Sequence, residues 1–110
     1  MLYDGALRFM EAGKHAMLAK DLEKQSQNLQ RAQKIVLELM SCLDMAAGAD
    51  IAKNLLALYT YALDQLVQAN LKDDPTGIDR SIRIFSELRE SWVTIEDKIK
   101  SGAMEQDHAA

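Results

Sequence analysis

The sequence predicts an all-α fold, an antiparallel up-down four-helix bundle, and three observations lead to this prediction. The stretches between turn signals are rich in the strong helix formers Ala, Leu, Lys, Glu, Gln and Met. Five glycines and one proline in 110 residues leave few places where the chain can turn. No stretch alternates apolar and polar residues with period two, so strands are not expected. We place the helices at about residues 1–19, 21–45, 50–71 and 75–100, in a single domain of residues 1–100 that is followed by a disordered tail, residues 101–110.

The first predicted helix, residues 1–19, has apolar or small residues at helical spacing from its first residue onward. They are Leu2, Tyr3, Ala6, Leu7, Met10, Gly13 and Met17. No capping residue precedes them, although helices commonly begin at one. We therefore expect the natural protein to have more sequence upstream.

The second predicted helix, residues 21–45, begins at Asp21, whose side chain can cap the free N–H groups of a first turn. Its apolar stripe predicts the buried residues Leu22, Leu29, Ala32, Val36, Leu39, Met40 and Leu43. Cys42, near the end, is expected to be a small core residue. Since it is the only cysteine of the chain, it excludes an internal disulfide and indicates a reducing compartment.

The third predicted helix, residues 50–71, is apolar along two adjoining stripes, whereas a simple bundle requires one stripe of a little over about 100°. Two interpretations are open. Either this helix lies centrally and contacts the other three, or one of its apolar arcs is a groove for a partner. Tyr59 and Tyr61 lie about 200° apart on the helix, so one of them has to be near the surface or at an interface.

The fourth predicted helix, residues 75–100, has the clearest pattern of the four. Asp74 can cap it, and Pro75 occupies its first helical position. Its apolar seam consists of Ile78, Phe85, Trp92 and Ile99 at intervals of seven, with Ser81, Ile82, Leu88 and Ile95 beside them. We expect Trp92 to be buried in this seam with Phe85 and Leu88.

Composition and charge exclude several classes of function. Thirteen basic against 17 acidic residues give a net charge of −4, which argues against nucleic-acid binding. No apolar run approaches the ~20 residues that span a bilayer, so membrane insertion is not expected. The single cysteine and the lack of a basic, apolar leader predict a cytoplasmic protein.

No set of residues predicts catalysis, a metal site or a cofactor. A di-iron bundle needs Glu-x-x-His pairs on inward helix faces, and the one such pair here, Glu105 and His108, falls in the predicted tail. Glu11 and His15 are spaced i, i+4 but lie toward the charged side of their helix. His15 also lacks the lysine and glycine that closely follow the reactive histidine of phosphotransfer domains. We therefore expect an exposed histidine without a chemical role, and no enzymatic activity.

Four motifs, one in each predicted helix, are similar to those of the bacterial flagellin-specific export chaperones. The first runs from Met1 to Phe9, as Met-Leu-Tyr-Asp-Gly-Ala-Leu-Arg-Phe, and the second from Ala32 to Asp44. The third begins at Lys53, as Lys-Asn-Leu-Leu-Ala-Leu-Tyr-Thr-Tyr, and the fourth is Leu-Arg-Glu-Ser-Trp, which ends at Trp92. The resemblance covers about residues 1–100. Members of the family normally carry a further segment upstream of the Met-Leu-Tyr motif, which can lie over the binding groove. The printed sequence begins at that motif, and we expect such a segment upstream of it in the natural protein.

The resemblance implies a cytoplasmic chaperone that binds the C-terminal segment of newly made flagellin. That segment is disordered in the monomer and assembles only in the filament, so the chaperone prevents premature polymerisation and delivers flagellin to the flagellar export gate. Neither catalysis nor a cofactor is implied. The alternative that the residues leave open is a self-associating helical bundle without a flagellin role, which uses the third helix as a homodimer interface in the absence of flagellin.

We expect the partner to bind the surplus apolar arc of the third helix together with the adjacent face of the first helix. The predicted binding residues are Tyr3, Leu7 and Met10 on the first helix, and Asn54, Leu55, Leu58, Tyr61, Ala62 and Gln65 on the third. Apolar members would anchor the i, i+3 and i+4 side chains of the partner, while Asn54 and Gln65 would bind its backbone. For Asn54, a solvated surface amide is the alternative.

Overall fold

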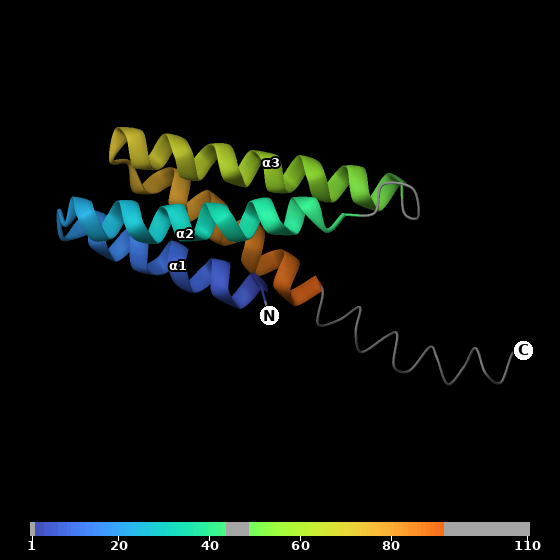
Figure 1. The fold of residues 1–110 in the computed structure, drawn as a ribbon, viewed down its shortest axis with the longest axis horizontal. Helices are drawn as coiled ribbons and strands as arrows, with labels where there is room; N and C mark the ends of the chain where they lie inside the picture. The colour runs from blue at the N-terminus through green and yellow to red at the C-terminus, as the bar shows by residue number, and fades with distance from the viewer. Residues whose placement is uncertain (1, 44–48, 92–110) are drawn as a thin grey trace, which may run out of the picture.

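The structure of the protein is a computed structural model, which describes residues 2–43 and 49–91. Three helices, α1 (Leu2–Leu18), α2 (Leu22–Ser41) and α3 (Ala49–Lys72), are followed by a fourth helical segment, residues 75–91 (Figure 1). The described residues contain no strand. The chain is thus an all-α four-helix bundle, as the sequence predicts. The predicted second half of the last helix, with Trp92, Ile95 and Ile99, lies outside the described residues, as does the predicted tail.

Contacts between the elements establish their order around the bundle. α1 lies against α2, and α2 lies against α3. The 75–91 segment meets α3 where Ser81 Oγ donates to the carbonyl oxygen of Ala62 at 3.0 Å. It meets α1 where Lys14 Nζ lies 2.7 Å from Asp79 Oδ1, and again at the ion pair of Arg89 with Asp4. α3 therefore lies diagonal to α1, but its Tyr59 hydroxyl still meets that of Tyr3 on α1, so α3 contacts all three other helical segments.

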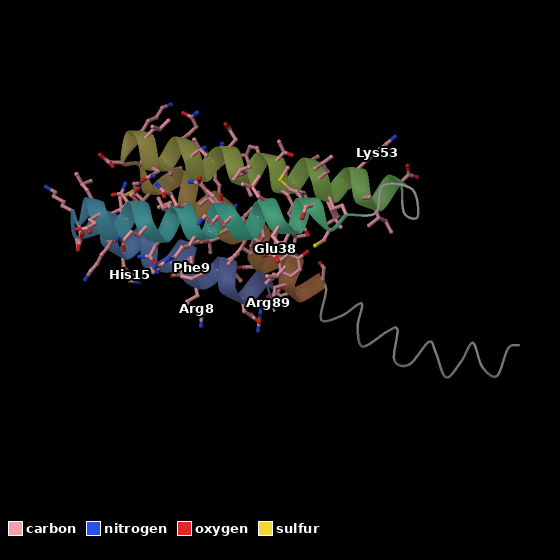
Figure 2. The ribbon with its side chains drawn as sticks, in the orientation of Figure 1. Arg8, Phe9, His15, Glu38, Lys53 and Arg89 are labelled. Atoms are coloured by element: carbon pink, nitrogen blue, oxygen red, sulfur yellow. The ribbon has the colours of Figure 1, made fainter. Side chains whose placement is uncertain are left out.

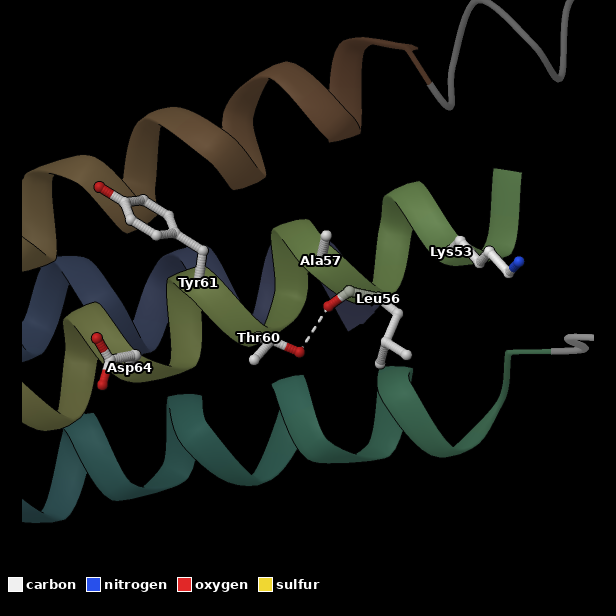
Figure 3. A pocket seen from close by; sticks show the side chains of 6 residues that line it. All are labelled: Lys53, Leu56, Ala57, Thr60, Tyr61 and Asp64. Carbon is white, nitrogen blue, oxygen red and sulfur yellow. Dashed lines mark hydrogen bonds between the residues drawn. The ribbon is translucent and has the colours of Figure 1, made fainter. Parts of the chain in front are cut away.

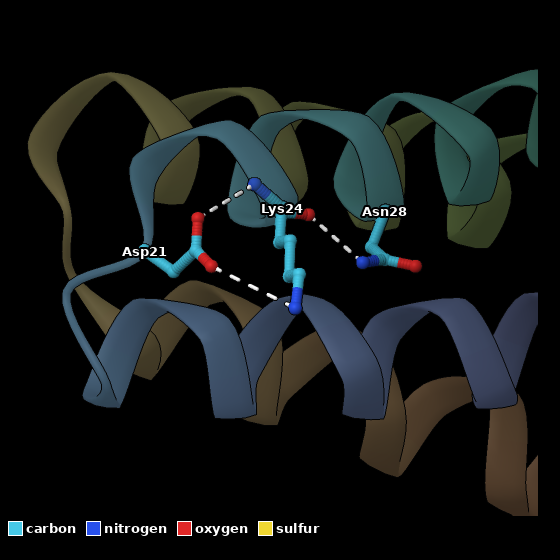
Figure 4. A network of polar contacts seen from close by, with 3 residues as sticks. All are labelled: Asp21, Lys24 and Asn28. Carbon is cyan, nitrogen blue, oxygen red and sulfur yellow. Dashed lines mark hydrogen bonds and ion pairs between the residues drawn. The ribbon is translucent and has the colours of Figure 1, made fainter.

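Both tight connections of the bundle are set by a short acidic side chain. Between α1 and α2, Lys20 takes a left-handed conformation with φ of 60°. Asp21 then caps α2, because its Oδ1 accepts from the backbone N–H of Lys24 at 3.2 Å (Figure 4). Before the 75–91 segment, Asp74 Oδ1 accepts from the backbone N–H of Thr76 at 2.9 Å. Both predicted caps are confirmed.

A continuous apolar core fills the space between the helices. Its buried members are Ala6, Met10, Met17, Leu29, Ala32, Val36, Tyr59, Ala62, Leu66, Ala69, Ile78 and Phe85. Two glycines let backbones approach closely: a Cβ at Gly13 would lie 2.6 Å from Leu29 Cδ2, and one at Gly77 would lie 2.5 Å from the carbonyl oxygen of Gln65. The predicted burial of Ile78, Ser81 and Phe85 in the last helix is confirmed.

The second helix departs from the prediction at both ends. α2 ends at Ser41 rather than near residue 45, and the backbone N–H of Cys42 closes its last turn on the carbonyl oxygen of Glu38 at 3.1 Å. Cys42 is exposed and is not the core residue expected, since it lies beyond the helix end. Leu22 was also expected to be buried, but its position at the tip of the bundle leaves it 62% exposed.

Gln25 is the buried residue of the first turn of α2, in place of Leu22. Its side chain is 2% exposed, and its Nε2 donates to Asn70 Oδ1 at 3.1 Å and to Asp73 Oδ1 at 2.8 Å. These two bonds tie the start of α2 to the end of α3. A polar network therefore closes this end of the bundle, where an apolar contact was expected.

Candidate functional site

Catalytic and metal-binding constellations do not stand out in the part of the chain that the structure describes. No group of three or more His, Cys, Asp or Glu side chains is placed there to hold a metal ion. None of the described helices is long and apolar enough to cross a membrane. His15 is exposed and points away from the bundle, as predicted (Figure 2). Exposed apolar surface is therefore the feature that can form a binding site on the described residues.

The outer face of α3 forms an open groove, which we call the α3 groove (Figure 3). Its lining residues are Lys53, Leu56, Ala57, Thr60, Tyr61 and Asp64. Tyr61 is 46% exposed, and Leu58 beside it is 39% exposed. Two large apolar side chains thus face solvent on a helix whose opposite face already contributes Tyr59, Ala62 and Leu66 to the core.

The floor of the α3 groove is less polar than its sequence suggests. Thr60 Oγ1 donates to the carbonyl oxygen of Leu56 at 2.7 Å, so its hydroxyl is satisfied within its own helix. Charges stand at the two ends, where Lys53 and Asp64 are eleven residues apart, or ~16 Å along the helix axis. The groove therefore offers about three helical turns of apolar surface with a cation at one end and an anion at the other.

A second hollow, which we call the bundle-end pocket, lies where the ends of the four helical segments meet. Its lining residues are Leu2, Tyr3, Leu39, Cys42, Leu43, Ile51, Leu55, Tyr59, Leu88 and Ser91. Its volume of about 400 Å³ is in the range of small-ligand pockets and is ample for large apolar side chains of a partner.

Three aromatic rings form one wall of the bundle-end pocket and the core behind it. The centroid of Phe85 lies 5.8 Å from those of Tyr3 and Tyr59, which are separated by 6.5 Å. The hydroxyl groups of Tyr3 and Tyr59 share a hydrogen bond across the bundle. The pKa of the Tyr59 hydroxyl is raised well above its ordinary value. Burial is the main cause, and the hydrogen bond to Tyr3 is the second. Tyr59 therefore stays neutral at physiological pH, and its hydrogen bond to Tyr3 is a fixed polar link in an apolar wall.

The predicted binding residues separate into exposed and buried groups. Leu58, Tyr61 and Asn54 are exposed on α3, and Tyr3 and Leu55 line the bundle-end pocket.

The other four predicted residues are less accessible. Leu7 is half-buried against the core, and Gln65 is half-buried and accepts from Arg80 Nη1 at 3.1 Å. Met10 and Ala62 are 0% exposed, because each lies on the core face of its helix. A partner cannot reach Met10 or Ala62 while the bundle is closed.

Sequence reasoning did not single out most of the residues that line these two surfaces. Lys53, Thr60 and Asp64 were not among the predicted binding residues, although they are spaced i, i+7 and i+11. With Ala57 between them, this spacing places them on one continuous face of the helix. The bundle-end pocket had no sequence signal, since it draws single residues from the ends of four separate segments.

Comparisons with known proteins point to one family. Residues 1–99 match the family model described as flagellar protein FliS. The chain is 40% identical to the flagellar secretion chaperone FliS of Vibrio cholerae over 92 residues, which cover 84% of this chain and 68% of the relative. It is 33% identical to FliS of Bacillus subtilis over 93 residues, with 84% and 68% covered. With FliS of Salmonella typhimurium it shares 32% identity over 99 residues, or 89% of this chain and 73% of the relative.

Proposed function

Since the chain belongs to the FliS family of flagellar secretion chaperones, we propose that it binds the C-terminal segment of flagellin in the cytoplasm. The resemblance drawn from the four sequence motifs is confirmed, and the family is one of chaperones and not of enzymes. In this proposal the chaperone keeps flagellin from polymerising early and delivers it to the export gate.

The observation that carries the proposal is the exposed apolar surface of α3. Its core face is filled by Tyr59, Ala62 and Leu66, so the exposed Leu58 and Tyr61 are not needed to hold the bundle together. An amphipathic segment that folds on binding would cover such a groove with its i, i+3 and i+4 side chains. Ordering the segment would offset much of the contact energy, so affinity would depend on a few anchors.

Each exposed residue has a defined role in the proposal. Tyr61 and Leu58 anchor apolar side chains of flagellin along α3, while Asn54 is free to bind backbone where the segment is not helical. Tyr3 and Leu55 receive a further apolar side chain in the bundle-end pocket. Leu7 packs against the core and supports the wall of the bundle-end pocket. Gln65 contacts flagellin only if its side chain gives up its hydrogen bond to Arg80.

Titration calorimetry with a peptide of the flagellin C-terminal segment tests the proposal. Tyr61→Ala should weaken binding by ~2 kcal/mol or more, which is about 30-fold in Kd, because a large anchor is truncated. Far-UV circular dichroism should show that the variant stays folded, since the ring lies outside the core.

Leu37→Ala is the matched control, because Leu37 is an exposed apolar residue on α2. It should leave binding unchanged. If the folded Tyr61→Ala variant bound the peptide as tightly as the wild type, the binding surface would have to lie on another face. If the wild-type chain did not bind the peptide, flagellin would be excluded as the partner.

Self-association is the second candidate use of the α3 groove. A homodimer in the absence of flagellin would cover the same exposed side chains, and sedimentation with and without the flagellin peptide separates the two occupants.

A further inference from the structure

Phe9 on α1 holds two arginine side chains at once, a feature that the proposed function does not use. The guanidinium carbon of Arg8, on the same helix, lies 5.9 Å from the centroid of the Phe9 ring, and that of Arg31 on α2 lies 5.8 Å from it. Both arginines are exposed, whereas Phe9 is half-buried and packs against the core. Figure 2 shows the ring between α1 and α2, with Arg8 directed away from the bundle. We call these three residues the Arg–Phe–Arg cluster.

The two guanidinium groups of the cluster have no carboxylate partner among the residues that the structure describes. The ion pairs of those residues use other cations, namely Lys14, Lys24 and Arg89. Contact with the face of a ring uses none of the five N–H donors of a guanidinium, because these lie in its plane. The ring therefore holds two cations in place whose donors can still bind an acceptor from outside the bundle.

The surface around the cluster is positively charged, although the chain as a whole carries a net charge of −4. Lys24 precedes Arg31 by seven residues, so it lies on the same face of α2, and Figure 4 shows it directed towards α1. Lys34, one turn after Arg31, is also exposed. The acids on this face are Glu38, which is exposed, and Asp21, which lies 4.0 Å from Lys24. The cluster and these neighbours together carry four positive and two negative charges.

From this arrangement we infer that the α1–α2 seam binds an acidic, extended segment of a second protein, whose carboxylates accept hydrogen bonds from Arg8 and Arg31. A guanidinium binds a carboxylate through two parallel N–H···O bonds, and less entropy is lost when its plane is already fixed. In an extended segment, the side chains of residues i and i+2 point to the same side and lie ~7 Å apart. Alternating acidic residues therefore suit two guanidinium groups that are held against one ring.

The overall charge of the chain favours a peptide over the other polyanions that arginine binds. Nucleic acids and anionic membranes gain much of their affinity from many separate charge contacts, and a chain with a net charge of −4 repels them at long range. An acidic segment needs only the few local contacts that the cluster offers.

The position of the cluster keeps it apart from the α3 groove. The cluster lies on α1 and α2, whereas the groove faces outward from α3, which is diagonal to α1. The acidic segment and flagellin could therefore be bound at the same time. This inference goes beyond the proposed function and does not depend on it.

Titration calorimetry of the full chain with a short peptide that alternates Glu and Ala tests the inference without flagellin. The wild type should bind this peptide with an affinity that falls as the salt concentration rises, and it should not bind the same peptide with Gln in place of Glu. Arg8→Gln and Arg31→Gln should each raise the Kd about fivefold or more, because each removes one charge-assisted contact. The double variant should abolish binding.

Two further variants separate the cluster from the general charge of the protein. Arg83→Gln is the matched control, because it removes the same charge from an exposed arginine of the 75–91 segment and should leave the Kd unchanged. Phe9→Leu keeps every charge and an apolar side chain but removes the ring that positions both guanidinium groups, so it should weaken binding. Circular dichroism of every variant checks that the fold is retained.

Three results would overturn the inference. If the wild type did not bind the Glu–Ala peptide, the cluster would serve only to hold α1 against α2. If the folded Phe9→Leu variant bound as tightly as the wild type, or if Arg83→Gln weakened binding as much as Arg8→Gln does, net charge and not this geometry would bind the peptide. If a single-stranded oligonucleotide or vesicles of phosphatidylserine and phosphatidylcholine bound more tightly than the peptide, the cluster would belong to another class of ligand.

Discussion

Gly77→Ala is expected to destabilise the bundle, although alanine is the better helix former. Gly77 is buried in the 75–91 segment, and a Cβ added there would lie 2.5 Å from the carbonyl oxygen of Gln65 and 3.1 Å from Ala69 Cβ. Its φ is not positive, so the glycine serves close packing and not backbone conformation. The obstacle is a backbone atom of α3, which cannot rotate away as a side chain can.

The magnitude follows from two opposing contributions to the free energy of unfolding. Replacing glycine by alanine in a helix gains at most about 1 kcal/mol. Overpacking that forces a backbone shift costs about 1–3 kcal/mol, and the shift would also stretch the nearby bond from Ser81 Oγ to the carbonyl oxygen of Ala62. We expect a net loss of ~1–2 kcal/mol.

Urea unfolding followed by circular dichroism measures this loss as a lower midpoint with an unchanged slope. Gly5→Ala is the matched control, because a Cβ there meets only the Cδ1 tip of Ile35, at 3.3 Å, among the atoms that the structure describes. It should be neutral or slightly stabilising. Were Gly77→Ala as stable as the wild type, the close approach of the 75–91 segment to α3 would be refuted.

Two further predictions concern stability. Phe85→Ala should lower the free energy of unfolding by ~3–5 kcal/mol, since the ring is fully buried against Tyr3 and Tyr59, and a loss under ~1 kcal/mol in urea unfolding would contradict its place in the core. The backbone N–H of Thr76 holds the pKa of the Asp74 carboxyl below its ordinary value of 3.8. The resulting stabilisation is present above that value and is lost as the pH falls through the lowered pKa. Asp74→Asn keeps a capping side chain that does not titrate, so it should flatten this part of the acid unfolding curve, and an unchanged curve would show that the cap does not contribute.

The sequence predicted those features of the fold that depend on local chemistry. Asp21 and Asp74 were identified as caps because a short acidic side chain before a helical stretch can accept from the N–H groups of the first turn. Phe85 and Ile78 were placed in the core because a seven-residue spacing keeps them on one helix face. Such signals are independent of which helix lies opposite.

Features that depend on neighbouring helices could not be predicted in the same way. A stripe of apolar residues does not show where the neighbouring helices end, so Leu22 was expected inside although it projects past the bundle tip. Gln25 is buried because Asn70 and Asp73, far along the chain, accept its hydrogen bonds. The same limit applies to the candidate site, since Ala62 could be placed in the core only once the 75–91 segment was known to cover it.

The two tyrosines of α3 show how one helix can serve folding and recognition separately. Tyr59 points inward, is 2% exposed, and shares its hydroxyl bond with Tyr3, whereas Tyr61 points outward into the α3 groove. Because they lie on opposite faces, a change at Tyr61 leaves the packing around Tyr59 untouched. The outer face of α3 can therefore change without disturbing the inner face that keeps the bundle intact.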